Sequence, residues 1–263
     1  MFKVALGQFA VSRIWQDNLH TSMTLMQQAE TAKAQLLVLP EGILARDIND
    51  PDLNCKQAQP LDGPFVNELL KVSQSMALTT IMTIHTPASG GLTYNTLVAI
   101  HQGKIVAKYR KLHLYDAFMD KESEKVMAGE QVPPLLDIGG VKLGLMICYD
   151  LRFPELARRL VLDGADVLVL SAAWVRGSLK ESHWEILLRA RALENTAYII
   201  GVNECGVRNI GCSMVVDPLG VIVAQAAEEP NLIFADIDQK RIAHVRQILP
   251  VLKNTRFDKP ELV

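Results

Sequence analysis

The sequence predicts an α/β protein in which two β-sheets pack face to face and helices cover their outer sides. Short apolar runs, such as residues 36–39 and 165–171, indicate strands that are buried on both faces. Helical apolar stripes separate such runs near both ends of the chain, and consecutive β-type runs fill its middle and later parts. Two packed sheets with helices on the outside would bury all of these apolar faces.

Each expected element rests on an apolar pattern that is bounded by turn or cap residues. The helix over 16–33, for example, carries one apolar stripe through Leu19, Met23 and Met26. The expected strands are 4–10, 36–39, 78–85, 93–100, 104–109, 141–147, 165–171, 197–203, 212–216, 221–226 and 232–237, and the expected helices are 16–33, 65–76, 154–162, 180–195 and 239–249. A long polar segment over 115–134 is typical of a binding loop.

The composition is that of one globular domain. The chain has 263 residues, of which 49% are hydrophobic and 21% are charged, and we find no linker-like stretch or internal repeat in it. We therefore expect a single domain over residues 1–263. A formal net charge of −2 and a pI near 6.3 give no electrostatic reason to expect nucleic acid or a membrane surface as a partner.

Cysteine usage and the N-terminal segment predict a cytoplasmic protein. The 4 cysteines include no Cys-x-x-Cys pair, so neither a zinc site nor a disulfide framework is expected. Residues 1–10 have the pattern of a strand, with too short an apolar run for a signal peptide. No apolar run approaches the roughly 20 residues that cross a bilayer.

Residues 141–160 place a cysteine at a sharp turn between a strand and a helix. Strand 141–147 runs directly into Cys148, and Pro154 suits the first turn of the following helix. Such a turn can lift a nucleophile above a sheet edge and direct backbone N–H groups at the atom that it attacks. A free cysteine can equally be an ordinary core residue, so this segment alone leaves both interpretations open.

Two further reactive side chains follow expected strands. Glu41 comes after strand 36–39 and Pro40, and sites of α/β proteins lie at such strand ends. Lys111 follows the strand at 104–109 in the same way. Taken one at a time, each is more simply an exposed side chain of a loop.

Together, the segments LVLPEG, YRKLHL and GLMICYDLRFPE resemble those of the nitrilase (carbon–nitrogen hydrolase) superfamily. The resemblance runs from Gly7 to Gly220 and includes a segment around Glu122 and Gly129. Residues 149–155 and 172–177 are most similar to the Nit branch, which contains deaminated glutathione amidases and ω-amidases. Ser178 stands where we expect a proline in that branch.

The resemblance implies a four-layer α-β-β-α subunit and a thiol amidase. Cys148 would be the nucleophile, Glu41 the proton acceptor, and Lys111 the proton donor or oxyanion stabiliser. Glu122 would orient Lys111 or the substrate, and the backbone N–H of Tyr149 would be a second oxyanion donor. No metal and no organic cofactor is needed for these steps. The family also implies a homodimer, for which helix 154–162 and the tail at about 239–263 are candidate contacts.

The implied substrate is a small linear amide, above all deaminated glutathione, which would be cleaved to 2-oxoglutarate and cysteinylglycine. A carboxylate substrate favours an arginine partner, so Arg176 is a candidate for substrate binding. Trp174 and His183 are candidates for the pocket wall. Three alternatives stay open: an ω-amidase that acts on 2-oxoglutaramate, an N-carbamoyl amino-acid amidohydrolase, and a non-catalytic binding protein on the same scaffold. Gly-x-Ser-x-Gly and His-Glu-x-x-His are both absent from the sequence, so serine-hydrolase and zinc-protease chemistry are not indicated.

Overall fold

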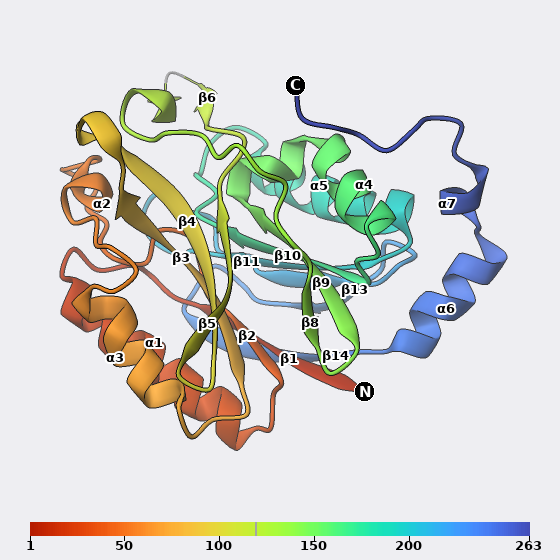
Figure 1. Ribbon diagram of the computed structural model, residues 1–263, viewed down its shortest axis with the longest axis horizontal. Coiled ribbons are helices and arrows are strands. Elements are labelled where there is room, and N and C mark those ends of the chain that lie inside the picture. The colour runs from red at the N-terminus through yellow and green to blue at the C-terminus, as the bar shows by residue number, and fades with distance from the viewer. Residues whose placement is uncertain (119) are drawn as a thin grey trace.

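Two six-stranded sheets lie face to face between two layers of helices (Figure 1). The structure is a computed structural model that describes residues 1–118 and 120–263. In spatial order, sheet 1 contains β14 (Asn231–Ile237), β1 (Phe2–Gln8), β2 (Leu36–Val38), β3 (Thr79–Pro87), β4 (Thr93–His101) and β5 (Lys104–Arg110). Sheet 2 contains β13 (Ile222–Gln225), β12 (Met214–Val216), β11 (Tyr198–Asn203), β10 (Val167–Ala172), β9 (Val141–Ile147) and β8 (Leu136–Ile138).

The helices are divided between the outer sides of the two sheets. α1 (Trp15–Thr31) and α3 (Pro64–Ser73) cover sheet 1, whereas α4 (Pro154–Leu162) and α5 (Lys180–Asn195) cover sheet 2 (Figure 1). The other helices and the small hairpin are α2 (Leu53–Lys56), α6 (Gln239–Ile248), α7 (Val251–Asn254), β6 (Asp116–Ala117) and β7 (Asp120–Lys121). The expected α-β-β-α layering is therefore confirmed.

The two sheets share one internal arrangement. Each contains three parallel strands, β1–β2–β3 in one and β9–β10–β11 in the other, and antiparallel strands extend both edges. Strands that run parallel end at the same edge of their sheet, which is where α/β proteins place their sites. The two such edges meet, because the N–H of Glu41, after β2, donates to the carbonyl of Ala172, at the end of β10, over 3.1 Å.

Alternating side chains of sheet 1 enter two different cores. Leu36 and Val38 belong to the apolar cluster that fills the space between the sheets and reaches α4 and α5. Leu37 and Leu39 belong to a second cluster, which packs against α1 and α3. On sheet 2, Gly201 has no side chain, so Leu188 of α5 packs closely on the sheet; a Cβ there would lie 2.9 Å from the leucine methyl groups. The central strands β2, β10 and β11 are thereby buried on both faces, as the apolar runs in the sequence predict, whereas the edge strands β5 and β13 alternate between buried or partly buried and exposed residues.

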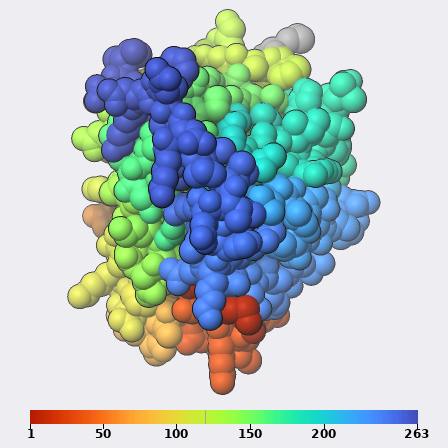
Figure 2. Space-filling view, turned by 90° about the vertical axis from the view of Figure 1, so that its right-hand side faces the viewer, coloured from red at the N-terminus to blue at the C-terminus, as the bar shows by residue number. Residues whose placement is uncertain are grey.

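The C-terminal residues run along the outside of the molecule. Figure 2 shows this segment in dark blue on the surface, and the carbonyl of Pro260 accepts a hydrogen bond from Nη1 of Arg159 on α4 over 2.8 Å. An ion pair between Lys259 and Asp163 adds a second contact to the same region. None of the helices within 1–118 and 120–263 combines the length and the apolar character needed to cross a membrane.

Candidate active site

Cys148 occupies a strained turn that begins directly after β9. Its backbone φ is 42°, in the left-handed region that non-glycine residues rarely adopt. The turn is a short 3₁₀ helix (Cys148–Arg152), and it is held by the fully buried carboxylate of Asp150. This carboxylate accepts hydrogen bonds from the N–H of Ile147 and the hydroxyl of Tyr109, each at 2.8 Å. The sequence-based strand, turn and helix are confirmed, with Pro154 at the start of α4.

Glu41 reaches the same place from the other sheet. Its carboxylate is buried, and each of its oxygens has a fixed donor: Oε1 accepts from Nδ2 of Asn95 at 2.7 Å, and Oε2 accepts from the N–H of Ala173 at 2.8 Å. Asn95 lies on β4 and Ala173 follows β10, so one donor comes from each sheet. The carboxylate position is therefore determined by both sheets.

Lys111 joins the two glutamates. Its Nζ lies 3.1 Å from Oε1 of Glu41 and 2.8 Å from Oε2 of Glu122, and its side chain is only 2% exposed. The lysine backbone is held on both sides, because its N–H donates to the carbonyl of Asn95 and its carbonyl accepts from the N–H of Gly129. Gly129 is needed for this approach, since a Cβ there would lie 2.3 Å from the carbonyl oxygen of Arg110. The structure thus brings Glu41, Lys111, Glu122 and Cys148 together.

The electrostatics of this cluster determine its resting protonation. Burial raises the pKa of Glu41, but Lys111, a hydrogen bond from Cys148 and the charge of Arg46 outweigh it, so the net pKa lies below the usual value. Burial lowers the pKa of Lys111, but Glu122 and Glu41 raise it well above its usual value. Burial and the charge of Glu41 raise the pKa of Cys148 well above the usual range, although Lys111 acts against them. The resting site is a carboxylate, an ammonium and a neutral thiol, so the carboxylate is placed to accept the thiol proton as the sulfur attacks.

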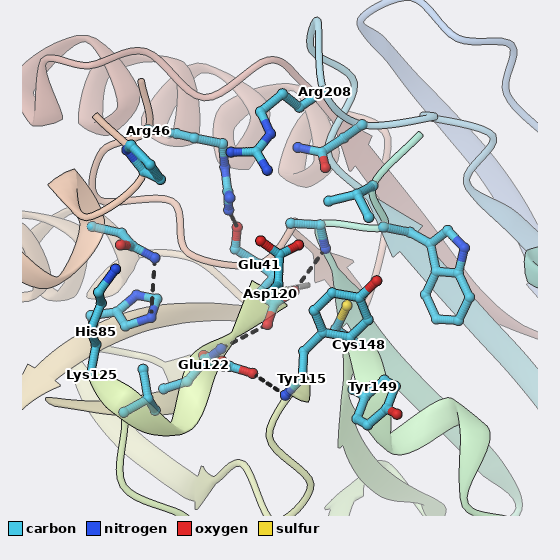
Figure 3. A pocket seen from close by; sticks show the side chains of 18 of the residues that line it. Glu41, Arg46, His85, Tyr115, Asp120, Glu122, Lys125, Cys148, Tyr149 and Arg208 are labelled. Atoms are coloured by element: carbon cyan, nitrogen blue, oxygen red, sulfur yellow. Dashed lines mark hydrogen bonds between the residues drawn. The ribbon is translucent and has the colours of Figure 1, made fainter. Parts of the chain in front are cut away.

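These groups form the floor of a pocket of about 210 Å³, which we call the main pocket (Figure 3). Several buried polar atoms in its wall have no partner within the described residues: Nδ1 of His85, Oδ1 of Asn95, Nε of Arg152 and both amide atoms of Asn209. Buried polar groups are normally hydrogen-bonded, so unpaired ones in a pocket wall indicate a polar ligand. The same described residues contain no cluster of three or more His, Cys, Asp or Glu that could hold a metal ion.

The structure separates the three predicted substrate-binding residues. Trp174 is buried and lines the main pocket, as does Tyr149. Arg176 instead lines a second pocket of about 380 Å³, the adjoining pocket, which shares part of its wall with the main pocket. His183 lines neither; its Nδ1 lies 3.5 Å from Nη2 of Arg152, whose guanidinium stands 4.7 Å from the ring centre of Trp174.

Several polar residues at the site were missed by the sequence analysis, among them His85 and Asn209 in the wall of the main pocket. Asn95 holds Glu41, Asp150 holds the turn at Cys148, and Lys180 and Arg208 line both pockets. Nζ of Lys180 donates to the hydroxyl of Tyr115 at 2.8 Å and has no carboxylate partner among the described residues. Asn95 could have been noticed, because asparagine is unfavourable in a strand interior. Arg208 gave no signal, since its loop has no apolar period.

Comparison with known proteins agrees with this geometry. Residues 3–247 match the model of the carbon–nitrogen hydrolase family. The chain is 52% identical over 260 residues to a protein of Escherichia coli O157:H7 named deaminated glutathione amidase, with 99% of each chain covered. Nit3 of Saccharomyces cerevisiae, described as a member of branch 10 of the nitrilase superfamily, has a TM-score of 0.85 at 29% identity and covers 97% of each chain. A mutant amidase of Nesterenkonia sp. AN1, solved with acrylamide added at its active-site cysteine, has a TM-score of 0.80 at 26% identity, with 95% of this chain and 98% of that chain covered.

The resemblance inferred from the three strand-end segments is confirmed by the family match and by the relatives. The match spans both sheets and every residue of the buried cluster. The chain therefore belongs to the carbon–nitrogen hydrolase family and is a hydrolase of carbon–nitrogen bonds.

Proposed function

We propose that this chain hydrolyses deaminated glutathione to 2-oxoglutarate and cysteinylglycine through a thioester on Cys148. The observation that carries the proposal is the buried cluster of Glu41, Lys111 and Cys148 on the floor of the main pocket, where a single ammonium touches both glutamates. The choice of substrate is supported by the relative from Escherichia coli, which is named for this amide and covers nearly the whole chain.

In the first half of the reaction, the Cys148 sulfur attacks the amide carbon while Glu41 accepts the thiol proton. The carbonyl oxygen becomes an oxyanion, which Lys111 and the backbone N–H of Tyr149 stabilise. Glu41 then gives its proton to the amide nitrogen, the C–N bond breaks, and cysteinylglycine leaves as an amine. The raised pKa of Cys148 supports this order, because a thiol that is neutral at rest needs a base at the moment of attack.

In the second half, water replaces the amine. Glu41 takes a proton from the water, the resulting hydroxide attacks the thioester carbon, and the C–S bond breaks as the sulfur recovers the proton. Lys111 stays protonated throughout, which its raised pKa supports. Glu122 accepts from the lysine with both oxygens, at 3.1 and 2.8 Å, so its role is to orient Lys111.

The 2-oxo acid end of the substrate would lie against Arg152 and Lys180. Both line the main pocket near Cys148, and neither has a carboxylate partner in the described part of the chain. Two buried or half-buried cations side by side are unfavourable, and burial with the charge of Arg152 indeed lowers the pKa of Lys180. A substrate carboxylate would neutralise them. His183 would then orient Arg152, and Trp174 would support its guanidinium face.

The nearest rival function is an ω-amidase that releases ammonia from 2-oxoglutaramate. Both amides carry the same 2-oxoglutaryl group, so the test is kcat/KM on the two substrates side by side. We expect a preference for deaminated glutathione, and we expect Cys148→Ala to abolish turnover of both. Cys205→Ala is the matched control, because that cysteine is also buried but lines neither pocket.

Each result of this assay has a definite meaning. Preference for 2-oxoglutaramate would make the chain an ω-amidase with the same cluster. If the Cys148→Ala variant still hydrolyses either amide, the thioester mechanism is wrong. Hydrolysis of neither amide would reject the proposed substrate class.

We further propose a cytoplasmic homodimer whose domain spans residues 1–263. Exposed apolar side chains on α5 and in the tail support a contact there: Ile186, Leu193 and Phe257 are 63%, 45% and 87% exposed. Four free cysteines, one of which is the proposed nucleophile, suit a reducing compartment. Size-exclusion chromatography with light scattering tests the dimer, and a monomer at working concentration would contradict it.

A further inference from the structure

The adjoining pocket contains two cations, Arg176 and Arg208, to which the proposed chemistry gives no role. Its wall includes three cations, Arg176, Arg208 and Lys180, against one carboxylate, that of Asp120. It also shares Tyr115, Asp120, Val175, Lys180 and Arg208 with the main pocket, so the two spaces are continuous along one side. A net positive space that opens beside a nucleophile favours an anionic part of the substrate.

Arg176 and Arg208 are held opposite one another. Val175 and Asn209 form an isolated antiparallel bridge, and beyond it the N–H of Arg176 donates to the carbonyl of Arg208 at 2.6 Å. Residues that face each other across such a bridge have neighbouring side chains on one face, and two like charges there are destabilising. Both arginines are exposed, and within residues 1–118 and 120–263 neither forms an ion pair. An anion between the two guanidinium groups would remove this repulsion and could be bound by both.

Asn209 provides an independent indication of a ligand at the same place. The residue is 1% exposed, it lines the main pocket, and neither its amide nitrogen nor its amide oxygen has a partner among the described residues. A buried amide without partners is rare and costly. It stands next to Arg208 in the chain, and Figure 3 shows Arg208 with Arg46 in the upper part of the view, above Glu41. A ligand that passes from the main pocket toward Arg208 can satisfy this amide.

We propose that Arg176 and Arg208 bind the carboxylate on the leaving-group side of the substrate, and that Asn209 hydrogen-bonds the peptide group before it. This inference rests on the proposed function. Deaminated glutathione has a carboxylate on each side of the scissile amide, whereas 2-oxoglutaramate has only the one on its acyl side. The arginine pair therefore selects an acylated dipeptide over a simple primary amide. The two residues of cysteinylglycine span at most about 7 Å, a distance suited to neighbouring pockets with a common wall.

The test combines an enzyme change with a substrate change. The enzymes are the native chain and the double variant Arg176→Gln, Arg208→Gln. The substrates are deaminated glutathione, its C-terminal carboxamide, and 2-oxoglutaramate. We expect the carboxamide to be a poorer substrate of the native enzyme by about ten- to hundredfold in kcat/KM, mainly through KM, as for the loss of charge-assisted hydrogen bonds. In the double variant, the acid and the carboxamide should differ by less than about threefold.

Two controls make the comparison specific. The loss in the double variant should be at least about tenfold larger for deaminated glutathione than for 2-oxoglutaramate, since only the former has the second carboxylate. Arg256→Gln changes an exposed arginine of the tail, which lines neither pocket, and should leave the ratio of the acid to the carboxamide as in the native enzyme. Equal losses on both substrates, or a native enzyme that does not distinguish acid from carboxamide, would overturn the inference.

A binding measurement keeps this result separate from the proposed function. Calorimetry on Cys148→Ala protein, with deaminated glutathione and its carboxamide as ligands, requires no turnover. Tighter binding of the acid that disappears when both arginines are changed supports the pair, even if the native enzyme prefers another amide. Equal binding of acid and carboxamide would reject the pair, whatever the native enzyme hydrolyses.

Discussion

The floor of the main pocket and the wall of the adjoining pocket are built in opposite ways. On the floor, Glu41, Lys111 and Cys148 each follow a strand and are buried. The carboxylate of Glu41 accepts hydrogen bonds from both sheets, and it also accepts one from Lys111. In the adjoining pocket, Arg176 and Arg208 are exposed and lie on loops. The groups proposed to make and break bonds thus depend on the sheets, and the groups proposed to select the substrate depend on segments that can change without disturbing the sheets.

The floor and the adjoining wall also differ in how much a substitution costs in stability. A buried ion pair is costly to assemble, and removing one partner leaves an uncompensated charge, so the floor tolerates little change. An exposed arginine is surrounded by solvent and costs little to replace. Substitutions on the floor should therefore affect all substrates and often stability, and substitutions in the adjoining wall should affect only substrates that reach it.

The largest effect is expected for Glu41→Gln. Loss of the base should lower kcat/KM by roughly 10²- to 10⁴-fold, and by the same factor on deaminated glutathione and 2-oxoglutaramate. Steady-state rates on both amides measure it, with the exposed Glu228→Gln as a matched control. A loss confined to one substrate would mean that Glu41 is a binding residue, and the contrast between floor and wall would disappear.

The second effect is on stability and concerns His85, which lies in the wall near Glu41. Burial lowers its pKa to about 4, below the usual 6.5. Because the pKa is lowered by folding, the free energy of unfolding has its full value above pH 6.5. It falls as the pH decreases toward 4, by about 3 kcal/mol in all. Urea unfolding at pH 7 and pH 4.5 should show that the native chain loses about 2 to 3 kcal/mol more than His85→Gln. Equal losses of unfolding free energy in the two proteins would show that water reaches the imidazole of His85 in the folded state.

A smaller effect is expected for Glu122→Gln. The substitution keeps the shape of the side chain and removes one of the two carboxylates that contact the ammonium of Lys111. We expect about a thirtyfold loss of kcat/KM, as for a hydrogen bond to a charged group. Because Glu122 helps to raise the pKa of Lys111, its loss should also move the alkaline limb of the pH profile to lower pH. A pH profile of kcat/KM measures both. An unchanged alkaline limb would indicate that Glu41 alone is sufficient to keep the pKa of Lys111 raised.

The smallest effect is expected where the two pockets meet. Lys180→Met should raise KM about tenfold for deaminated glutathione and for 2-oxoglutaramate alike, with kcat nearly kept, because both share the 2-oxo acid end. The comparison with Arg176 and Arg208 then becomes quantitative: a change at Lys180 should affect both amides, and a change at the arginine pair only one. If Lys180→Met affects deaminated glutathione alone, the lysine belongs to the leaving-group side.

Most of the fold could be predicted from the sequence, because long apolar patterns with caps and turns dominate it. Helices α4 and α5 and strand β9 were predicted with their observed bounds, and the other expected strands are present with one or both ends moved by one or two residues. The elements that were not expected are very short: α2, α7, β8 and the β6–β7 hairpin have two to four residues each. Segments of that length cannot carry an apolar period, and they form because tertiary contacts hold them.

That Glu41, Lys111 and Cys148 lie together was predictable for a physical reason. A reactive side chain at the end of a buried strand is brought to the sheet edge by the fold itself, and this holds for Glu41, Lys111 and Cys148. The resting charge of the thiol was not predictable, because it depends on burial and on Glu41, which raise the pKa of Cys148 more than Lys111 lowers it. Arg208 could not have been found either, since its loop reaches the pocket through tertiary contacts such as the bridge between Val175 and Asn209, which no pattern in the sequence indicates.

The neutral state of the Cys148 thiol affects how readily this residue is oxidised. Peroxide reacts with thiolates far faster than with thiols, so susceptibility to oxidation follows thiolate character. Burial raises the pKa of Cys55, Cys205 and Cys212 as well, in the case of Cys205 to about 12. The enzyme should therefore keep its nucleophile reduced between turnovers, and form the reactive sulfur only while an amide carbon is there to accept it.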